Sequence, residues 1–199
     1  MPRRRPGDAF AWHAATDTGS AQAPAQDGGV LRGGSGMSDE QGARISDLEE
    51  RLARLEDERA VTRLITAYGP LVDAGCADAV AALWAPDGVY DVDEIRMEGR
   101  EQIAAMVRSG RHPRWIADGC AHVVGPPHVT VEGDEAVAVG HSLMVVHGAE
   151  GHRLRRATAN HWRLQRGSAG WQVTSRTSRV LDGRTESPAL LAEGMGEPR

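Results

Sequence analysis

The sequence has no lysine, one phenylalanine and two cysteines, and aromatic residues make up only 4% of the chain. All basic residues are arginines, and 23 of them against 28 acidic residues give a formal net charge of −5, which argues against a nucleic-acid partner. Cys76 and Cys120 are too few for a disulfide framework and lie in no CxxC or CxxH motif. No apolar run approaches the roughly 18 residues of a membrane span. With no cofactor motif either, these absences predict a reduced, cytoplasmic protein that holds no metal or cofactor and binds no nucleic acid or membrane.

Composition divides the 199 residues into three parts. Residues 1–37 are rich in glycine, alanine, proline and serine and lack periodicity, so we expect a disordered extension, with Met37 resembling a bacterial start. The arginines near its beginning precede no apolar stretch of the kind that forms an export signal. Residues 38–185 are expected to fold as a single domain, and residues 186–199 to form a loosely docked tail.

Apolar residues at helical spacing predict a long first helix. The stripe consists of Ile45, Leu48, Leu52 and Leu55, followed by Val61, Leu64, Ile65 and Tyr68. Its first half has coiled-coil spacing, but two heptads are fewer than the three or four by which a coiled coil is recognised from sequence, so we favour a helix that packs on its own domain. Gly69-Pro70 is expected to end or kink this helix. Shorter helices are expected at residues 78–84 and 99–108.

The second half of the sequence alternates between apolar and polar residues, as strands do. A turn at residues 85–88 precedes a short strand at 89–92, and another short strand includes Val129 and Val131. Three long strands are predicted at residues 136–147, 154–164 and 171–181, separated by glycine-containing turns, which makes an antiparallel meander. In the first of these, Val139, His141 and Leu143 share one parity and are expected to face the interior. Helices followed by a curved sheet predict an α+β fold.

Three stretches resemble the SnoaL-like branch of the nuclear-transport-factor-2-like superfamily: ERAVTRLITAYGPLVDAGCADAVAALWAPDGVY, AHVVGPPHVTVEGDEAVAVGH and ANHWRLQRGSAGWQVTSRTSRVLDG. They occur in the family's order and span nearly all of residues 38–183. The resemblance implies a cone-shaped barrel, in which N-terminal helices pack in a strongly bent antiparallel sheet around a deep, largely apolar pocket. Members include dehydratases, dehydrochlorinases, ketosteroid isomerases, epoxide hydrolases, polyketide cyclases and non-catalytic subunits, so the fold alone does not give the function.

The catalytic residues that the resemblance implies are Tyr68, Asp73 and His122. In the subgroup of bile-acid 7α-dehydratase, hexachlorocyclohexane dehydrochlorinase and scytalone dehydratase, an aspartate after the first helix pairs with a histidine that follows the third helix. Asp73 and His122 match these positions. In the pattern of the bile-acid dehydratase a tyrosine precedes the aspartate by five residues, as Tyr68 precedes Asp73. A carboxylate bonded to one imidazole nitrogen fixes the tautomer, so the other nitrogen can accept a proton without a metal. Tyr68 is expected to donate a hydrogen bond to a leaving hydroxyl or a developing enolate.

His141, Asn160 and Arg176 are candidates for substrate binding. His141 is inward by parity, so it either lines the pocket or bonds to a neighbouring strand. Asn160 shares a predicted face with Trp162 and is a candidate for orienting a substrate oxygen. Arg176 follows Trp171 by five residues, as a pocket arginine does in the dehydrochlorinase, but its parity is opposite to that of Trp171. Arg176 therefore reaches the pocket only if the strand contains a bulge.

These residues favour a cofactor-independent lyase or isomerase that acts on a small-to-medium apolar ring compound. The inward side of residues 136–147 has no carboxylate, which argues against a ketosteroid isomerase, and a histidine replaces the early-strand polar group of the epoxide hydrolases. A polyketide-type cyclase or tailoring enzyme and a non-catalytic binding protein stay open as alternatives. Because relatives form dimers or trimers through the outer face of the sheet, a homo-oligomer is expected, with Trp162, Leu164 and Val180 as candidates for that face.

Overall fold

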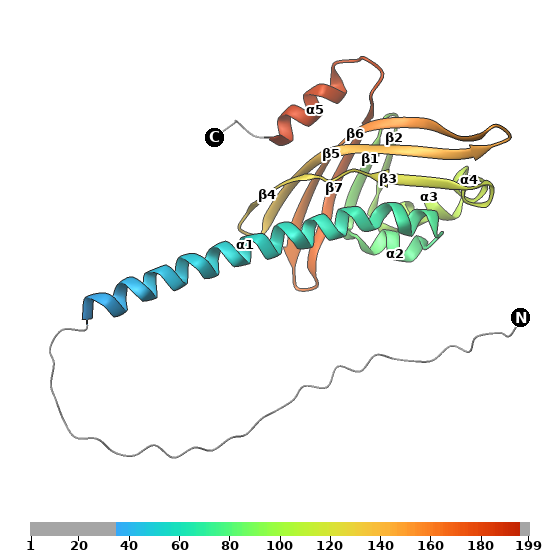
Figure 1. Ribbon diagram of the computed structural model, residues 1–199. Coiled ribbons are helices and arrows are strands. Elements are labelled where there is room, and N and C mark those ends of the chain that lie inside the picture. Colours follow the sequence, from blue (N-terminus) through green and yellow to red (C-terminus); the bar gives the residue numbers. More distant parts are fainter. Residues whose placement is uncertain (1–34, 196–199) are drawn as a thin grey trace, which may run out of the picture. The chain divides into compact units, whose positions relative to one another are not determined.

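The computed structural model describes residues 35–195, with side chains described from residue 39, and its described residues form one compact unit from Gly42 onward (Figure 1). The elements are α1 (Ser35–Asp73), α2 (Ala77–Ala82), β1 (Trp84–Val92), β2 (Ile95–Glu98), α3 (Gly99–Arg108), α4 (His112–Asp118), β3 (Cys120–Val124), β4 (His128–Glu132), β5 (Glu135–Gly148), β6 (Gly151–Gly167), β7 (Gly170–Val180) and α5 (Glu186–Met195). The expected disordered extension lies outside the described residues, except that residues 35–37 begin α1. No helix in the described part of the chain is long and apolar enough to span a bilayer.

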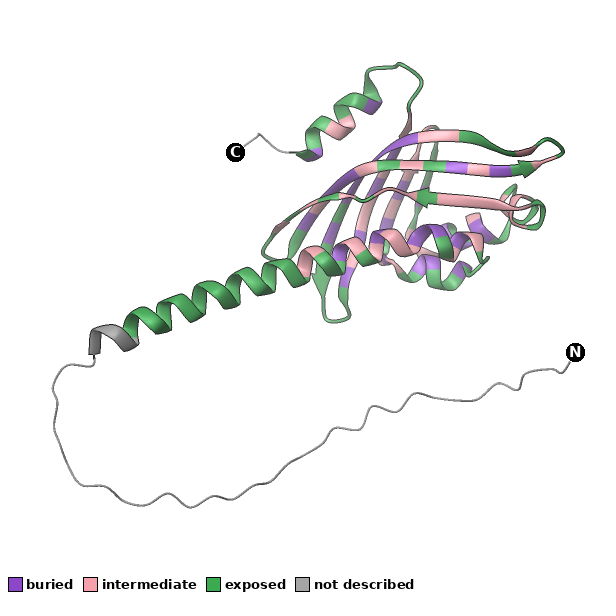
Figure 2. Ribbon diagram, in the orientation of Figure 1, coloured by how far each residue is buried: buried purple, intermediate pink, exposed green. Residues whose placement is uncertain are grey.

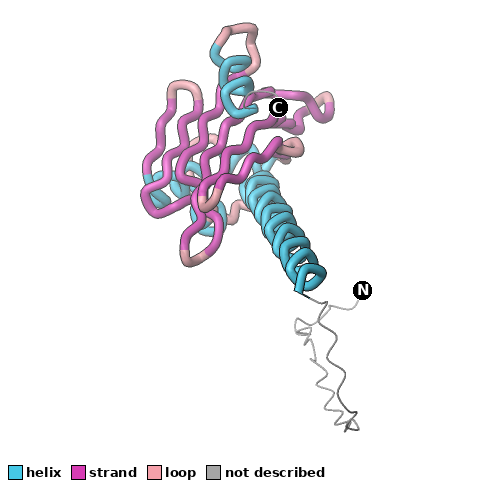
Figure 3. Tube along the Cα trace, turned by 90° about the vertical axis from the view of Figure 1, so that its left-hand side faces the viewer, coloured by secondary structure: helices cyan, strands magenta, loops and turns pink. Residues whose placement is uncertain are grey.

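The seven strands form one curved sheet in the order β2-β1-β7-β6-β5-β3, and β4 also pairs with β5 (Figure 3). The three long strands β5, β6 and β7 pair antiparallel, which confirms the predicted meander. Gly151 and Gly170 at its turns, and Gly133 in the turn from β4 into β5, have positive φ, a conformation that glycine adopts without steric cost. The pair of β1 and β7 is parallel, so the sheet is not purely antiparallel.

The hydrophobic core lies between the helices and the inner face of the sheet. The second half of α1 contributes Val61, Ile65 and Val72, which are fully buried. From the sheet, Trp84 and Trp162 are the largest fully buried side chains, and their rings lie 6.0 Å apart. Figure 2 shows the buried residues of α1 only in the part of the helix nearest the sheet. This core confirms the α+β class.

The structure corrects two points in the expectations for α1. The helix does not end at Gly69-Pro70 but continues to Asp73, because Val72 is anchored in the core while Pro70 lies at the exposed side, where its missing N–H is tolerated. The first half of the helix does not pack on its own domain, since residues 39–56 are exposed throughout.

Short elements account for the other differences before the meander. The predicted helix at residues 78–84 is α2, which ends at Ala82, and the helix at 99–108 is α3 as expected. Residues 85–88 do not separate a helix from a strand but form an irregularity inside β1, between the pairs Trp84–Val173 and Val89–Ser175. The strand β2 and the helix α4 occupy segments for which no element was predicted.

The inner face of β5 is the opposite of the predicted one. The register pairs Ser142 with Thr158 and Gly140 with Asn160 on the inner side, whereas His141 pairs with Ala159 and is exposed on the outer side. Parity was misleading because the inner side of β5 carries only alanine, glycine and serine from Ala136 to Ser142, and Met144 and Val146 follow beyond them, whereas the outer side carries valine and leucine. The inner set still contains no carboxylate, so the argument against a ketosteroid isomerase is unaffected.

The outer face of the sheet is covered in part by α5, where a loosely docked tail was expected (Figure 1). The helix approaches so closely that a Cβ added to Gly194 would lie 2.0 Å from Val139 Cγ1 and 2.9 Å from His161 Cδ2. The packing of α5 buries His161. Trp162 and Leu164 were candidates for an outer oligomer face, but both are buried in the core. Of the three candidates, only Val180 lies outside the core.

Candidate active site

A cavity of about 900 Å³ lies between the helices and the inner face of the sheet. Its apolar wall includes Tyr90, Met97 and Met106, and its polar wall includes Tyr68, His122 and Arg176. These residues come from α1, β1, β2, α3, β3 and β7, so the site is assembled from both halves of the domain. The volume lies in the range of 300–1,000 Å³ that is typical of small-molecule sites.

Asp73 and His122 are in contact at the wall of this cavity. Asp73 Oδ1 lies 2.6 Å from His122 Nδ1, and Asp73 Oδ2 accepts a hydrogen bond of 2.8 Å from the backbone N–H of His122. Both carboxylate oxygens are thus bound to one residue, which fixes the carboxylate and the ring relative to each other. If Nδ1 carries the proton that the carboxylate accepts, Nε2 is left as the basic nitrogen. His122 lines the cavity, so that nitrogen is placed to meet a ligand.

A close approach of α1 to β3 makes this contact possible. A Cβ added to Gly69 would lie 1.9 Å from the backbone oxygen of His122, so only glycine fits there. Asp73 lies four residues further along α1, which is about one helical turn, and therefore on the same side of the helix. The absence of a side chain at position 69 brings that side within hydrogen-bond distance of His122.

Gly69→Ala is expected to separate the two residues of the dyad. The added methyl group meets a backbone atom that cannot move aside, so we expect a loss of about 1–3 kcal/mol in stability and a fall in turnover of about tenfold or more. The matched control is Gly42→Ala, also in α1, whose Cβ would meet nothing within 4 Å and which should gain about 0.5–1 kcal/mol. Thermal melts and a turnover assay measure both effects. Unchanged turnover in Gly69→Ala would show that the close approach does not position the dyad.

Arg176 is buried among aromatic rings at the base of the cavity. Its guanidinium carbon lies 4.1 Å from the ring centroid of Trp162, 4.3 Å from that of Tyr68 and 4.6 Å from that of Tyr90. Its Nη1 is the one buried side-chain nitrogen or oxygen among the described residues that has no hydrogen-bond partner. A buried guanidinium without a carboxylate partner leaves a positive charge available to a ligand in the cavity.

The bulge that Arg176 requires is present. Between β6 and β7 the pairing passes from Arg163–Ser175 directly to Leu164–Val173, which leaves Thr174 as the extra residue. Trp171 and Val173 before the bulge and Arg176 after it are buried. The extra residue reverses the parity, so all three can face the core and the cavity.

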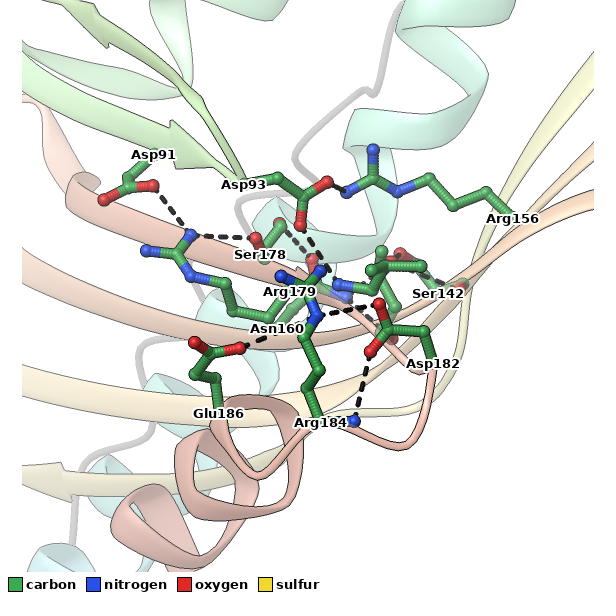
Figure 4. Close-up of polar contacts among 12 residues, drawn as sticks. Asp91, Asp93, Ser142, Arg156, Asn160, Ser178, Arg179, Asp182, Arg184 and Glu186 are labelled. Carbon is green, nitrogen blue, oxygen red and sulfur yellow. Dashed lines mark hydrogen bonds and ion pairs between the residues drawn. The ribbon is translucent and has the colours of Figure 1, made fainter.

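Asn160 holds Arg176 instead of lining the cavity. Figure 4 shows Asn160 with two other partners, Ser178 and Ser142. Asn160 Oδ1 accepts hydrogen bonds from Arg176 Nη2 at 2.8 Å, from Arg176 Nε at 3.2 Å and from Ser178 Oγ at 2.6 Å. Its Nδ2 donates to Ser142 Oγ at 3.0 Å. Asn160 is on the predicted face, but its hydrogen-bonding capacity is used within the protein, so we assign it to positioning Arg176 and not to contact with a substrate.

The sequence that forms these elements matches a family model. The description "SnoaL-like domain" matches residues 53–177, which include Tyr68, Asp73, His122, Asn160 and Arg176. The chain belongs to the SnoaL-like family.

Solved structures share this fold, and one of them is also similar in sequence. An NTF2-like protein with a cystatin-like fold from Novosphingobium aromaticivorans is 41% identical, covers 74% of this chain and 96% of its own, and superposes with a TM-score of 0.72. A protein of unknown function from Mycobacterium tuberculosis is 20% identical over 79% of this chain and 82% of its own, with a TM-score of 0.53. Aln2 from Streptomyces is 18% identical over 61% of this chain and 88% of its own, with a TM-score of 0.55, and like the second shows the fold alone. No curated protein matches the sequence.

The SnoaL-like cavity contains functional candidates that the sequence did not reveal. Besides Arg176, which the sequence had indicated, three arginines line it, namely Arg111, Arg155 and Arg156, and none of its described lining residues is acidic. His112 stacks on His122 with a centroid distance of 5.8 Å, and burial, followed by the nearby His122, lowers the pKa of His112. Proline is common in the first turn of a helix, so the pair His112-Pro113 could have indicated from the sequence that His112 lies at the start of a helix, α4. His141, in contrast, lies on the outer face of the sheet and is absent from the cavity wall.

Asp73, Cys120 and His122 offer three potential metal ligands within 4.8 Å of one another. Their present contacts favour hydrogen bonds over a metal ion. Asp73 Oδ1 and His122 Nδ1 are at hydrogen-bond distance, and Cys120 Sγ donates to the same Oδ1 at 3.4 Å. Burial, followed by the adjacent carboxylate, raises the pKa of Cys120 to about 11, so without a metal its thiol is protonated at neutral pH and can donate this hydrogen bond.

Proposed function

We propose that this SnoaL-like protein is a cofactor-independent lyase or isomerase, in which His122 removes a proton from a carbon next to a carbonyl group. The observation that carries the proposal is the contact of Asp73 with His122 at 2.6 Å, on the wall of a cavity large enough for a ring compound. The contact resembles the dyad of the dehydratase subgroup. A histidine oriented in this way is a general base at neutral pH.

The reaction begins when His122 Nε2 accepts the proton of an acidified C–H bond. The electron pair of that bond moves toward the carbonyl and gives an enolate, while Asp73 stabilises the imidazolium cation. In an elimination, the enolate expels a β-hydroxyl group, and the proton on His122 passes to that group, so that water leaves and a C=C bond remains. In an isomerisation, the same proton returns to a different carbon.

Arg176 and Tyr68 are placed to stabilise the enolate. The charge on Arg176 has no carboxylate to neutralise it, so it favours an oxygen that becomes negative during the reaction. Burial raises the pKa of Tyr68 far above its usual range, so the hydroxyl stays protonated and remains a hydrogen-bond donor. Its ring lies 6.5 Å from that of His122, which places the base and this donor on adjacent parts of the wall.

The substrate class follows from the cavity wall. Aromatic and methionine side chains suit an apolar ring, and the acid-free wall with its arginines suits a compound with a carbonyl oxygen or another oxygen that carries negative charge. We therefore propose a small-to-medium cyclic carbonyl compound as the substrate.

The test is exchange of a substrate proton with solvent. A panel of cyclic ketones, esters and thioesters with and without a β-hydroxyl group is incubated with the protein in D₂O and followed by proton NMR. We expect deuterium to appear next to the carbonyl of at least one compound, and the hydroxyl compounds to lose water. The Asp73→Asn variant should abolish both signals. If compounds from the panel bind and none exchanges, the protein is a binding protein and the proposal is wrong.

A further inference from the structure

The first half of α1 exposes an apolar stripe that no described part of the chain covers. Ile45, Leu48, Leu52 and Leu55 are 51–62% exposed, although leucine and isoleucine are among the residues most often buried. Residues 39–56 of α1 are all exposed, as the colour of this part of the helix in Figure 2 shows. A helix without tertiary contacts is marginal in water, so a partner that covers the stripe would stabilise it.

The exposed stripe is not a continuation of the core-facing stripe. At 100° per residue, the centre of the exposed set lies about 150° around the helix from the centre of the buried set Val61, Ile65, Tyr68 and Val72. The two stripes therefore occupy nearly opposite faces of α1. The inner face of the sheet, which contacts the second half, cannot cover the first half as well.

The spacing of the stripe is that of a two-stranded coiled coil. With Ile45 and Leu52 at position a and Leu48 and Leu55 at position d, the apolar residues recur every 3.5 residues on average. Ile45 at a with Leu48 at d favours two parallel strands over three or four, whereas Leu52, at the second a position, is not β-branched and adds no such preference.

The charged residues beside the stripe select a partner and an orientation. In a parallel pair, position g of one helix lies next to position e of the following heptad in its partner. These positions are Arg44 with Glu49, Arg51 with Glu56, and Glu58 with Arg63, and each pair has opposite charges. In an antiparallel pair, g faces g and e faces e, which brings Arg51 near Arg51 and Glu49 near Glu49 of the partner.

We propose that residues 44–56 of α1 form a parallel, in-register coiled coil with a second copy of this chain. The self-complementary charges identify the partner as an identical helix. The segment is continuous with the buried half of α1, so the helix is already nucleated and association need not order it from a coil. The proposed interface differs from the outer face of the sheet, which α5 covers in part, and it does not depend on the proposed function.

The oligomeric state of the full chain tests the interface. We expect light scattering after gel filtration to give the mass of a dimer, and Leu48→Glu together with Leu52→Glu to halve it. The matched control is Ser46→Glu with Ala53→Glu, which places two glutamates in the same segment at position b, away from the interface, and should leave the mass unchanged. Circular dichroism shows that each variant is folded. A monomeric parent, or a mass that the leucine substitutions do not lower, overturns the proposal.

Disulfide trapping tests the orientation. In a background with the exposed Cys76 replaced by serine, Leu48→Cys should form a disulfide-linked dimer under oxidation, because identical d positions face each other in a parallel pair. Ser46→Cys should remain unlinked. An antiparallel pair would instead require Leu48→Cys on one chain and Leu52→Cys on the other. Linkage in that combination, without linkage of Leu48→Cys to itself, contradicts the parallel arrangement.

Discussion

His122→Ala is expected to lower turnover by on the order of 10²–10⁴, which is the typical contribution of a general base. The substitution removes the imidazole whose Nδ1 contacts the Asp73 carboxylate and whose Nε2 is the proposed base. Binding of the substrate should change much less, because the apolar wall and Arg176 remain. Turnover and dissociation constants, measured with a compound from the exchange panel, separate these effects.

Two further variants determine whether the dyad acts as a unit. Asp73→Asn keeps the shape of the side chain, but the amide can present a donor to His122 Nδ1 and so favour the wrong tautomer, and we expect a loss of similar size to that of His122→Ala. Their double variant should be no worse than either single one, because residues that act together are not additive. His141→Ala removes an exposed histidine on the outer face and should have no effect. If His122→Ala retains more than about a tenth of the turnover, His122 is not the base.

Local sequence patterns predicted the elements that local physics determines. Alternation and glycine-containing turns identified the meander of β5 to β7, because strand pairing across short turns involves residues close in sequence. The same reasoning failed for α1, where the Gly69-Pro70 break was overridden by the burial of Val72 in the core. Secondary-structure propensity gives way when tertiary packing opposes it.

The faces of β5 and β6 show a second limit. Apolar residues mark the buried side of a strand only if the other side meets water, and here α5 covers Val139 and His161 on the outer side. On the inner side, β5 carries Gly140 and Ser142 before Met144, so the apolar pattern on that side is interrupted in the middle of the strand. The sequence around β5 indicates neither the cover by α5 on the outer side nor the cavity on the inner side, so His141 was assigned to the wrong face.

The dyad could be inferred from the sequence only through the family resemblance. Asp73 and His122 are 49 residues apart, and no periodicity connects them. What brings them together is the contact of Gly69 with the backbone of His122, which is a tertiary feature. For Arg176, in contrast, the sequence pattern itself was informative. Its parity indicated that the strand needs a bulge for Arg176 to reach the pocket, and the structure contains a bulge at Thr174.

Arg176→Met is expected to lower turnover by about 10²–10³ while changing stability little. The loss of turnover follows from removing a positive charge that faces a developing oxyanion in a site shielded from water. For stability, two effects oppose each other. Burial of an ion costs several kcal/mol, whereas each desolvated contact of the guanidinium with an aromatic ring contributes about 2 kcal/mol, and there are three such rings. Methionine also fills much of the same space, and Ser178 still donates to Asn160.

Asn160→Asp distinguishes an electrostatic role of Arg176 from a purely structural one. The substitution places a carboxylate oxygen where Arg176 Nη2 and Nε and Ser178 Oγ now donate, so the ion pair should raise the melting temperature. The same carboxylate neutralises the charge that would attract the enolate, so turnover should fall although the guanidinium keeps its place. Opposite changes in stability and turnover are thus expected from one substitution. If turnover instead follows stability upward, or if Arg176→Met keeps turnover within about threefold, the charge on Arg176 does not stabilise an oxyanion.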